Sequence, residues 1–199
     1  MKISILLPFK ENFSPTYAGA VSLFINDTLK LSKYKKNTTV FGNTNYKEKF
    51  KSKYINISLR KSFFQSQNKK YVEEFIKLEK KRNSDLIELH NRPIYLSYLS
   101  NELNDRTFLL YFHNDPLTMS GSKTISERIF LMKKCFKIIF NSNWSKSRFL
   151  IDLPNTINNY KIEVVHQSTS KTKIDFNKKQ KLISFVGKLN ESKGYDIFG

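Results

Sequence analysis

Short apolar runs alternate with helical patterns along most of this chain. Apolar runs without polar alternation are typical of strands buried on both faces of a parallel sheet, and they occur at residues 2–7, 109–112 and 137–140. Further strand candidates are residues 39–41, 54–59, 85–89, 162–165 and 182–186. Helical spacing of apolar residues marks 21–29 and 72–79, with two more helix candidates at 93–100 and 125–136. The repeated strand–helix order predicts an α/β fold with a doubly wound, Rossmann-like parallel sheet.

A polar stretch without periodicity interrupts this pattern at residues 171–181. We interpret it as a linker between domains. Residues 1–170 then form a first Rossmann-like domain. Residues 182–199 supply only the first strand and loop of a second, incomplete domain, because the sequence ends at Gly199.

Composition limits the classes of protein to which the chain can belong. Of its 199 residues, 39% are hydrophobic and 14% aromatic, which excludes collagen-like and disordered classes. The single cysteine, Cys135, excludes a disulfide scaffold and a zinc site built from several thiolates. Its neighbours Lys134 and Phe136 favour an ordinary buried cysteine over a reactive thiol.

The chain is strongly basic, with 35 Lys and Arg against 17 Asp and Glu and a net charge of +18. Such a charge attracts phosphate, nucleic acid and anionic lipid, and does not choose among them. Abundant lysine and asparagine also follow from A+T-rich coding without any functional demand.

No apolar stretch approaches the 18 residues of a membrane span, and no signal peptide is recognisable. We therefore expect a cytoplasmic protein, with possible peripheral contact with the inner face of an anionic membrane. The residues expected to make this contact are lysines in two clusters, Lys47, Lys49, Lys51 and Lys53, then Lys61, Lys69 and Lys70.

Ligands of open α/β sheets bind beyond the carboxyl ends of the strands, so polar residues in those loops are candidates for function. In the first such loop, Gly19 opens a helix and can offer backbone N–H groups to an anion or a sugar hydroxyl, unless it is a plain turn. In the second, His90 can hydrogen-bond a substrate or be structural, and Asn91 can cap the helix that begins near Pro93.

The third loop contains His113, Asn114 and Asp115. An imidazole with a nearby carboxylate can position a hydroxyl and handle its proton, although Asn-Asp-Pro is equally common in turns. The fourth loop leads from a buried strand into Gly187 and Lys188, with Lys193 and Gly194 before a helix. This arrangement suits a diphosphate, and a solvated lysine-rich turn is the alternative.

Taken in order, these segments resemble a GT-B glycosyltransferase of the retaining family 4 type. The matching segments are Ile3–Leu7, Ala18-Gly19, His90, His113–Asp115, Ile138–Ser142 and Phe185–Leu189 with Lys193-Gly194. Three departures stand out: Ala18 replaces the first glycine of a usual pair, Lys188 replaces an arginine, and the hinge segment 164–168 is atypical. Lys188 keeps the charge and loses the bidentate fork of arginine.

The resemblance implies transfer of a sugar from a nucleotide-sugar donor to an acceptor hydroxyl with retention at the anomeric carbon. It implies a saccharide or lipid-linked acceptor, a place in cell-surface polysaccharide or glycolipid synthesis, and no metal or further cofactor. His113 is the expected catalytic residue. Residues expected to bind the acceptor side are Gly19, His90, Asn114, Asp115 and Ser142, and those expected to bind donor phosphates are Gly187, Lys188, Lys193 and Gly194.

Because the donor half is nearly absent, we expect this chain alone to transfer no sugar and to bind nucleotide sugars only in the millimolar range, about −4 kcal/mol. Two alternatives stay open. Aromatic residues interleave with lysines in 47–54 and 61–71, as in a basic nucleic-acid-binding module, although no recognised motif occurs. A nucleotide-sugar epimerase of the non-hydrolysing GT-B kind has the same fold and no acceptor.

Overall fold

The computed structural model describes residues 1–59, 66–154, 159–168, 184, 185, 194 and 197. It divides into two compact units, Met1–Gln167 and Ser168–Gly199. The predicted strand at 182–186 falls mostly outside the described residues, and the fold below is that of the first unit.

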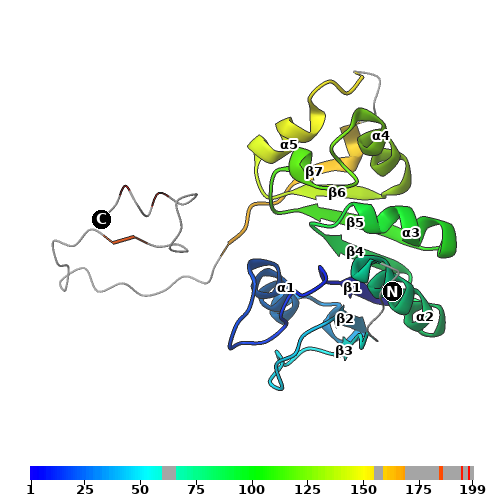
Figure 1. Cartoon of the computed structure of the whole chain (residues 1–199), viewed down its shortest axis with the longest axis vertical. Helices are drawn as coiled ribbons and strands as arrows, with labels where there is room; N and C mark the ends of the chain where they lie inside the picture. The colour runs from blue at the N-terminus through cyan, green and yellow to red at the C-terminus, as the bar shows by residue number, and fades with distance from the viewer. Residues whose placement is uncertain (60–65, 155–158, 169–183, 186–193, 195–196, 198–199) are drawn as a thin grey trace. The chain divides into compact units, whose positions relative to one another are not determined.

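The first unit is built on a seven-stranded sheet in which every pair of neighbouring strands is parallel. The order across the sheet is β3-β2-β1-β4-β5-β6-β7, so the crossover direction reverses between β1 and β4 (Figure 1). The strands are β1 Ile3–Leu6, β2 Thr38–Gly42, β3 Tyr54–Asn56, β4 Leu86–His90, β5 Thr107–Phe112, β6 Lys137–Phe140 and β7 Ile162–Val164.

Helices alternate with these strands and cover the two faces of the sheet unequally. They are α1 Ala20–Leu31, α2 Gln67–Arg82, α3 Ile94–Glu102, α4 Ile125–Lys134 and α5 Asn143–Leu150. Three short 3-10 turns, η1 Lys35–Asn37, η2 Pro116–Thr118 and η3 Asn159–Lys161, complete the described elements. In Figure 1, α1 lies on one side of the sheet, and α2 and α3 lie on the other.

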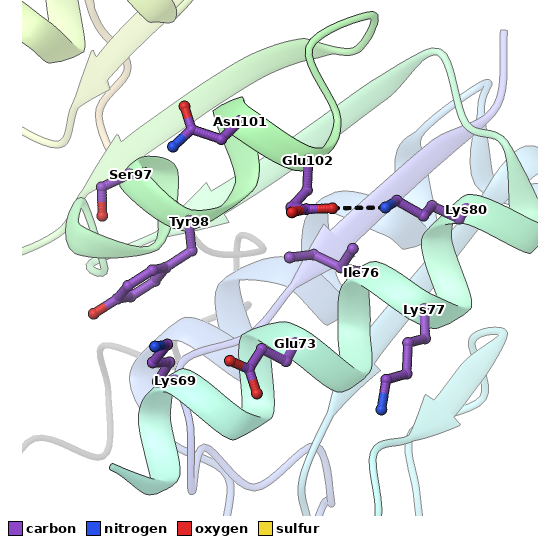
Figure 2. A pocket seen from close by; sticks show the side chains of 9 residues that line it. All are labelled: Lys69, Glu73, Ile76, Lys77, Lys80, Ser97, Tyr98, Asn101 and Glu102. Atoms are coloured by element: carbon purple, nitrogen blue, oxygen red, sulfur yellow. Dashed lines mark hydrogen bonds and ion pairs between the residues drawn. The ribbon is translucent and has the colours of Figure 1, made fainter. Parts of the chain in front are cut away.

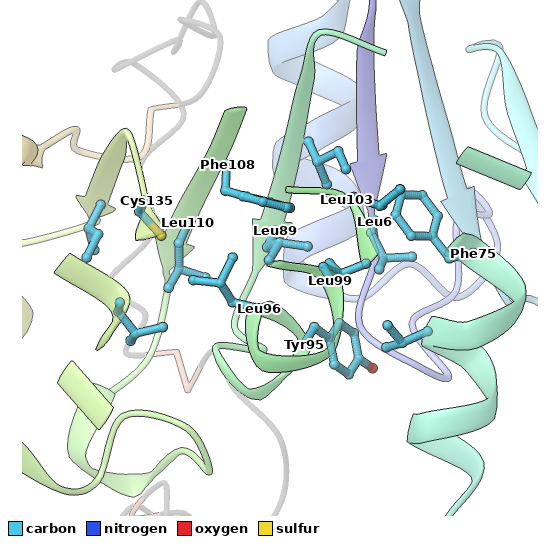
Figure 3. Close-up of a cluster of buried hydrophobic side chains, with 14 of the residues drawn as sticks. Leu6, Phe75, Leu89, Tyr95, Leu96, Leu99, Leu103, Phe108, Leu110 and Cys135 are labelled. Carbon is cyan, nitrogen blue, oxygen red and sulfur yellow. The ribbon is translucent and has the colours of Figure 1, made fainter. Parts of the chain in front are cut away.

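Two apolar clusters hold these layers together. The larger one packs buried residues of α2, α3, α4 and α5 against one face of the sheet, with Phe75, Leu96 and Phe149 among its members. Its centre, including Leu89 and Leu110 from adjacent strands, is drawn in Figure 3. The smaller cluster packs α1 against β1 and β2. The face of β4 and β5 that is turned toward α1 belongs to neither apolar cluster and carries polar and aromatic residues, described below.

The predicted alternation of strands and helices is confirmed, with differences at the element ends. The strand expected at 54–59 ends at Asn56. The helix expected at 125–136 ends at Lys134, because Cys135 takes an extended conformation (φ −80°, ψ 143°). A capping box between Thr124 and Glu127 defines its start. Cys135 is buried, and burial raises the pKa of its thiol to about 12, so it is the core cysteine that its neighbours predicted.

Candidate active site

Four polar or aromatic side chains share the α1 face of β4 and β5 at the carboxyl edge of the sheet. Glu88 and His90 are two positions apart on β4 and therefore share one face of the strand. Tyr111 of β5 and His113, just beyond the end of β5, are spaced in the same way. His90 pairs with Tyr111 in the parallel register, so the two sets lie side by side. The rings of His90 and Tyr111 stack at 4.9 Å with planes 9° apart.

A continuous chain of hydrogen bonds runs through this face. The Glu88 carboxylate lies 2.7 Å from Nε2 of His90. Nδ1 of His90 lies 2.9 Å from Nε2 of His113, and Nδ1 of His113 lies 2.8 Å from the side-chain amide nitrogen of Gln167. His90 is completely buried, whereas Gln167 is exposed. The chain therefore leads from a carboxylate inside the protein to a polar group at its surface.

The main chain of His113 is held from both sides by side-chain amides. Its N–H donates to Oδ1 of Asn91 at 2.7 Å, and its carbonyl accepts from Nδ2 of Asn141 at 2.8 Å. Asn91 has a left-handed φ of 51°. The prediction that Asn91 caps the following helix is wrong. The N-cap is Pro93, with no side-chain cap, because the Asn91 amide is committed to His113.

Burial controls the protonation of His113. Its ring contacts the edge of Phe24 from α1, with centroids 5.0 Å apart. Desolvation, with the nearby His90 ring as a second cause, lowers the pKa of His113 to about 3. The ring is therefore neutral near pH 7, with one nitrogen donating and the other accepting. A neutral imidazole of this kind can accept a hydrogen bond from a hydroxyl at the sheet edge.

Asp115 does not serve as the carboxylate of this imidazole. It pairs with Arg148 of α5 at 3.0 Å and accepts from the N–H of Leu117 at 3.0 Å. Partial burial raises the pKa of Asp115, but the hydrogen bonds from Arg148 and Leu117 outweigh it, so the net pKa is lowered. The imidazole that does bond to a carboxylate is that of His90, through Glu88, and His113 reaches this pair through the His90 ring.

Two further predicted residues act locally as helix-start elements. Ser142 caps α5, with its hydroxyl accepting from the N–H of Ser145 at 3.2 Å. Gly19 is the N-cap of α1, and the first-turn N–H of Ser22 donates to the Glu11 carboxylate at 3.1 Å. A side chain at position 19 would collide with that carboxylate. Glycine thus leaves room for the Glu11 carboxylate, and a ligand at this helix start would have to displace Glu11.

The remaining predicted residues are not brought together with these. Asn114 is exposed beside His113. Gly187, Lys188 and Lys193 lie outside the described residues. Gly194 belongs to the second unit, where its positive φ of 71° suits glycine.

Sequence reasoning missed four members of the site: Glu88, Tyr111, Asn141 and Gln167. Glu88 had a usable signal, because a carboxylate two positions before His90 in a strand must share its face. Asn141 follows the end of β6 as His113 follows β5. Gln167 had no local signal, since it lies 54 residues from His113 in the chain.

A groove of about 490 Å³ lies between α2 and α3, away from the histidines (Figure 2). Its lining mixes charges of both signs, and Lys80 pairs with Glu102 across it at 2.7 Å. We assign it no chemistry. Among the described residues, no group of three or more His, Cys, Asp or Glu side chains could hold a metal ion. In the same part of the chain, no helix is long and apolar enough to cross a membrane.

Solved structures of three kinds are similar to this chain. HepE of Anabaena with UDP and glucose gives a TM-score of 0.58 at 16% identity, over 85% of this chain and 45% of that one. A glycosyltransferase from Rickettsia africae gives 0.52 at 20% identity, over 83% and 43%. The UDP-GlcNAc 2-epimerase of Methanocaldococcus jannaschii gives 0.50 at 15% identity, over 83% and 45%.

The first unit is one Rossmann-like half of a GT-B fold. The chain spans less than half the length of the structures it resembles. At these identities the likeness establishes the fold alone. Neither protein-family models nor curated protein sequences give a match to this chain.

Proposed function

We propose that this protein takes part in transferring a sugar from a nucleotide-sugar donor to an acceptor hydroxyl, with retention at the anomeric carbon. The observation that carries the proposal is the neutral His113 ring at the carboxyl edge of the sheet, with Nδ1 bonded to the exposed amide of Gln167. Likeness to a UDP-glucose complex of HepE and to a glycosyltransferase supports it.

In this proposal the acceptor hydroxyl replaces the Gln167 amide as the donor to Nδ1 of His113. The hydroxyl oxygen bonds to the anomeric carbon on the same face from which the donor phosphate oxygen departs, as retention requires, the bond from that carbon to the phosphate oxygen breaks, and the nucleoside diphosphate leaves. The hydroxyl proton goes to Nδ1 of His113. Because the pKa of His113 is low, the proton moves late, when bond formation has made the hydroxyl acidic.

Other residues have supporting roles in the proposal. Asn114, Asp115 and Ser142 flank the acceptor, Gly19 lies at the neighbouring helix start, and His90 contributes through His113. For the donor diphosphate we propose Gly187, Lys188, Lys193 and Gly194. No metal or cofactor is proposed, because lysine charges and backbone N–H groups can neutralise phosphates.

We further propose a saccharide or lipid-linked acceptor in cell-surface polysaccharide or glycolipid synthesis, reached from the cytoplasmic side of the membrane. The basic surface would hold the protein near an anionic bilayer, gaining about 1 kcal/mol per lysine close to it. Lys47, Lys51, Lys53 and Lys69 are exposed, as this requires. Sedimentation should show binding to anionic vesicles and much weaker binding to neutral ones, and equal binding to both would contradict the membrane proposal.

The decisive test is His113→Ala in a protein that joins this chain to a complete donor-binding unit. Turnover should fall by about 10²-fold or more, the loss typical of an acid/base or charge-positioning group, while the chain still folds. His166→Ala is the matched control, because His166 is an exposed histidine. Turnover within twofold of the wild type for His113→Ala would refute the proposed role.

A nucleotide-sugar epimerase is the second candidate, favoured by the likeness to a UDP-GlcNAc 2-epimerase. Epimerisation also requires proton transfer at carbon, and His113 could contribute to it. Product analysis separates the two candidates. An epimerase converts UDP-GlcNAc without any acceptor, whereas a transferase releases UDP in proportion to glycosylated acceptor.

A further inference from the structure

The acidic member of the histidine network, Glu88, is not part of the function proposed above, which rests on His113. Glu88 lies on β4, and 18% of its side chain is exposed. The next residue on the same face of this strand, toward its carboxyl end, is His90. An ionised carboxylate can only accept hydrogen bonds. Nε2 of His90 lies 2.7 Å from the Glu88 carboxylate. This nitrogen must therefore carry the proton of the hydrogen bond.

That requirement propagates along the chain of hydrogen bonds. In a neutral His90 with a protonated Nε2, Nδ1 is an acceptor. Nε2 of His113 lies 2.9 Å from Nδ1 of His90 and must then be the donor. Because the His113 ring is neutral, its Nδ1 is left without a proton. At the far end, the Gln167 amide nitrogen can only donate, and it lies 2.8 Å from that Nδ1. The two ends of the network thus demand the same ring protonation.

We propose that Glu88 is a positioning residue that acts through His90 to set the tautomer of His113. With the tautomer set, Nδ1 of His113 meets the acceptor hydroxyl as a hydrogen-bond acceptor. When Nδ1 takes the hydroxyl proton, His113 becomes an imidazolium, and the Glu88 carboxylate balances its charge through His90. This inference rests on the proposed function for its catalytic consequence and on geometry alone for the tautomer.

The surroundings keep the network in this arrangement. Tyr111 stacks on His90 and cannot easily lose a proton, because burial and the nearby carboxylates of Glu88 and Glu163 raise the pKa of its hydroxyl. Glu163 pairs with Lys137 on the adjoining strands. From α1, the ring of Phe24 closes over both histidines. On β4 to β7 and just beyond β5, the charged or titratable groups of this sheet face are thus Glu88, His90, His113, Tyr111, Lys137 and Glu163, and Tyr54 lies on the same face farther away, on β3.

Nitrogen NMR of the histidine rings in this chain tests the proposal, and only three histidines contribute signals. The wild-type spectrum near pH 7 should show protonated Nε2 and unprotonated Nδ1 in both His90 and His113. A protonated Nδ1 on His113 would overturn the proposal. This measurement decides without any variant and without any enzyme activity.

Glu88→Gln is the matching variant, because it removes the constraint at the Glu88 end and keeps Gln167 at the other end. The population of the wild-type tautomer in His90 and His113 should then fall, and ring protonation should move to lower pH. The control is Glu163→Gln, another carboxylate exchange on the same sheet, which should leave both rings unchanged. A Glu88→Gln spectrum identical to the wild type would also overturn the proposal.

The outcome is separable from that of the proposed function. If the rings show the expected protonation but His113→Ala keeps full turnover, the sugar-transfer role fails and the tautomer assignment stands. If the rings show the opposite protonation but His113→Ala loses turnover, His113 stays catalytic and the role of Glu88 fails.

Discussion

Two carboxylates lie on opposite faces of the same sheet, and their partners differ in kind: Glu79 reaches the sheet from α2, and Glu88 lies within β4 on the α1 face. Glu79 is completely buried and accepts hydrogen bonds from Ser4 at 2.5 Å and from the N–H of Ser84 at 2.8 Å. The guanidinium of Arg106 lies 3.9 Å away. None of these three partners releases or takes up a proton near neutral pH.

Glu88 instead faces His90, whose two ring nitrogens can each donate or accept a hydrogen bond. One carboxylate therefore ties elements together, and the other has a partner whose hydrogen-bonding pattern can change. The comparison teaches that burial of a charge does not indicate function by itself. The chemistry of the partners is what separates the two cases.

The largest difference between the two carboxylates should appear in protein stability, when Glu79 is replaced by alanine. Removing the carboxylate leaves the buried hydroxyl of Ser4 and the buried N–H of Ser84 without their acceptor and removes the negative charge 3.9 Å from Arg106, which should lower the free energy of unfolding by about 3–5 kcal/mol. Urea unfolding of the chain measures this loss. Glu74→Ala on the same helix is the control and should cost less than about 1 kcal/mol, because the Glu74 carboxylate is partly exposed and its ion pair with Lys77 is on the surface. A Glu79→Ala loss as small as the control's would remove the distinction.

The second effect is the response of the carboxyl edge to acid. The pKa of His113 is about 3 in the folded chain and about 6.5 in its ordinary state. Between these values the unfolded chain binds a proton that the folded chain does not bind. The free energy of unfolding should therefore fall as the pH falls from about 6.5 towards 3, by up to about 1.4 kcal/mol per pH unit.

Urea unfolding at pH 7 and pH 5 measures this acid sensitivity, and His113→Asn should reduce it. His166→Ala should keep it, because His166 is exposed. Equal pH dependence in the wild type and in His113→Asn would show that the folded ring titrates normally.

The smallest change in the free energy of unfolding should come from Asp115→Asn, which tests whether a second carboxylate near the histidines behaves like Glu79 or like Glu88. Asp115 lies at the functional edge and yet has a guanidinium partner, Arg148, as a structural carboxylate would. Since this ion pair is partly exposed, its loss should cost about 1 kcal/mol or less. The ring-nitrogen spectrum of His90 and His113 should not change. A changed tautomer in Asp115→Asn would show that Asp115, and not Glu88 alone, controls the histidines.

The sequence was sufficient to predict the fold because the signals that specify it are local. Apolar runs and helical spacing depend on residues a few positions apart, and the order of elements then restricts the topology. The same reasoning placed His90 and His113 at one edge, since parallel strands end on the same side. Their adjacency follows from β4 and β5 being neighbours.

The partners within the site were not predictable in the same way. Asp115 lies two residues from His113 in the chain, but its carboxylate pairs with Arg148, which is 33 residues away. Glu11 reaches the start of α1 across a loop whose path the sequence does not reveal. Choices of this kind depend on where a side chain points after folding, and spacing along the chain carries little information about that.

The amide clamps on the main chain of His113 have a consequence for how such a protein can diversify. Asn91 and Asn141 come from the ends of the two flanking strands, and they hold His113 independently of the segment that follows it. The exposed residue Asn114 can therefore be exchanged while the imidazole keeps its place. Under the proposed function, such an exchange would alter the surroundings of the acceptor without moving the main chain of His113.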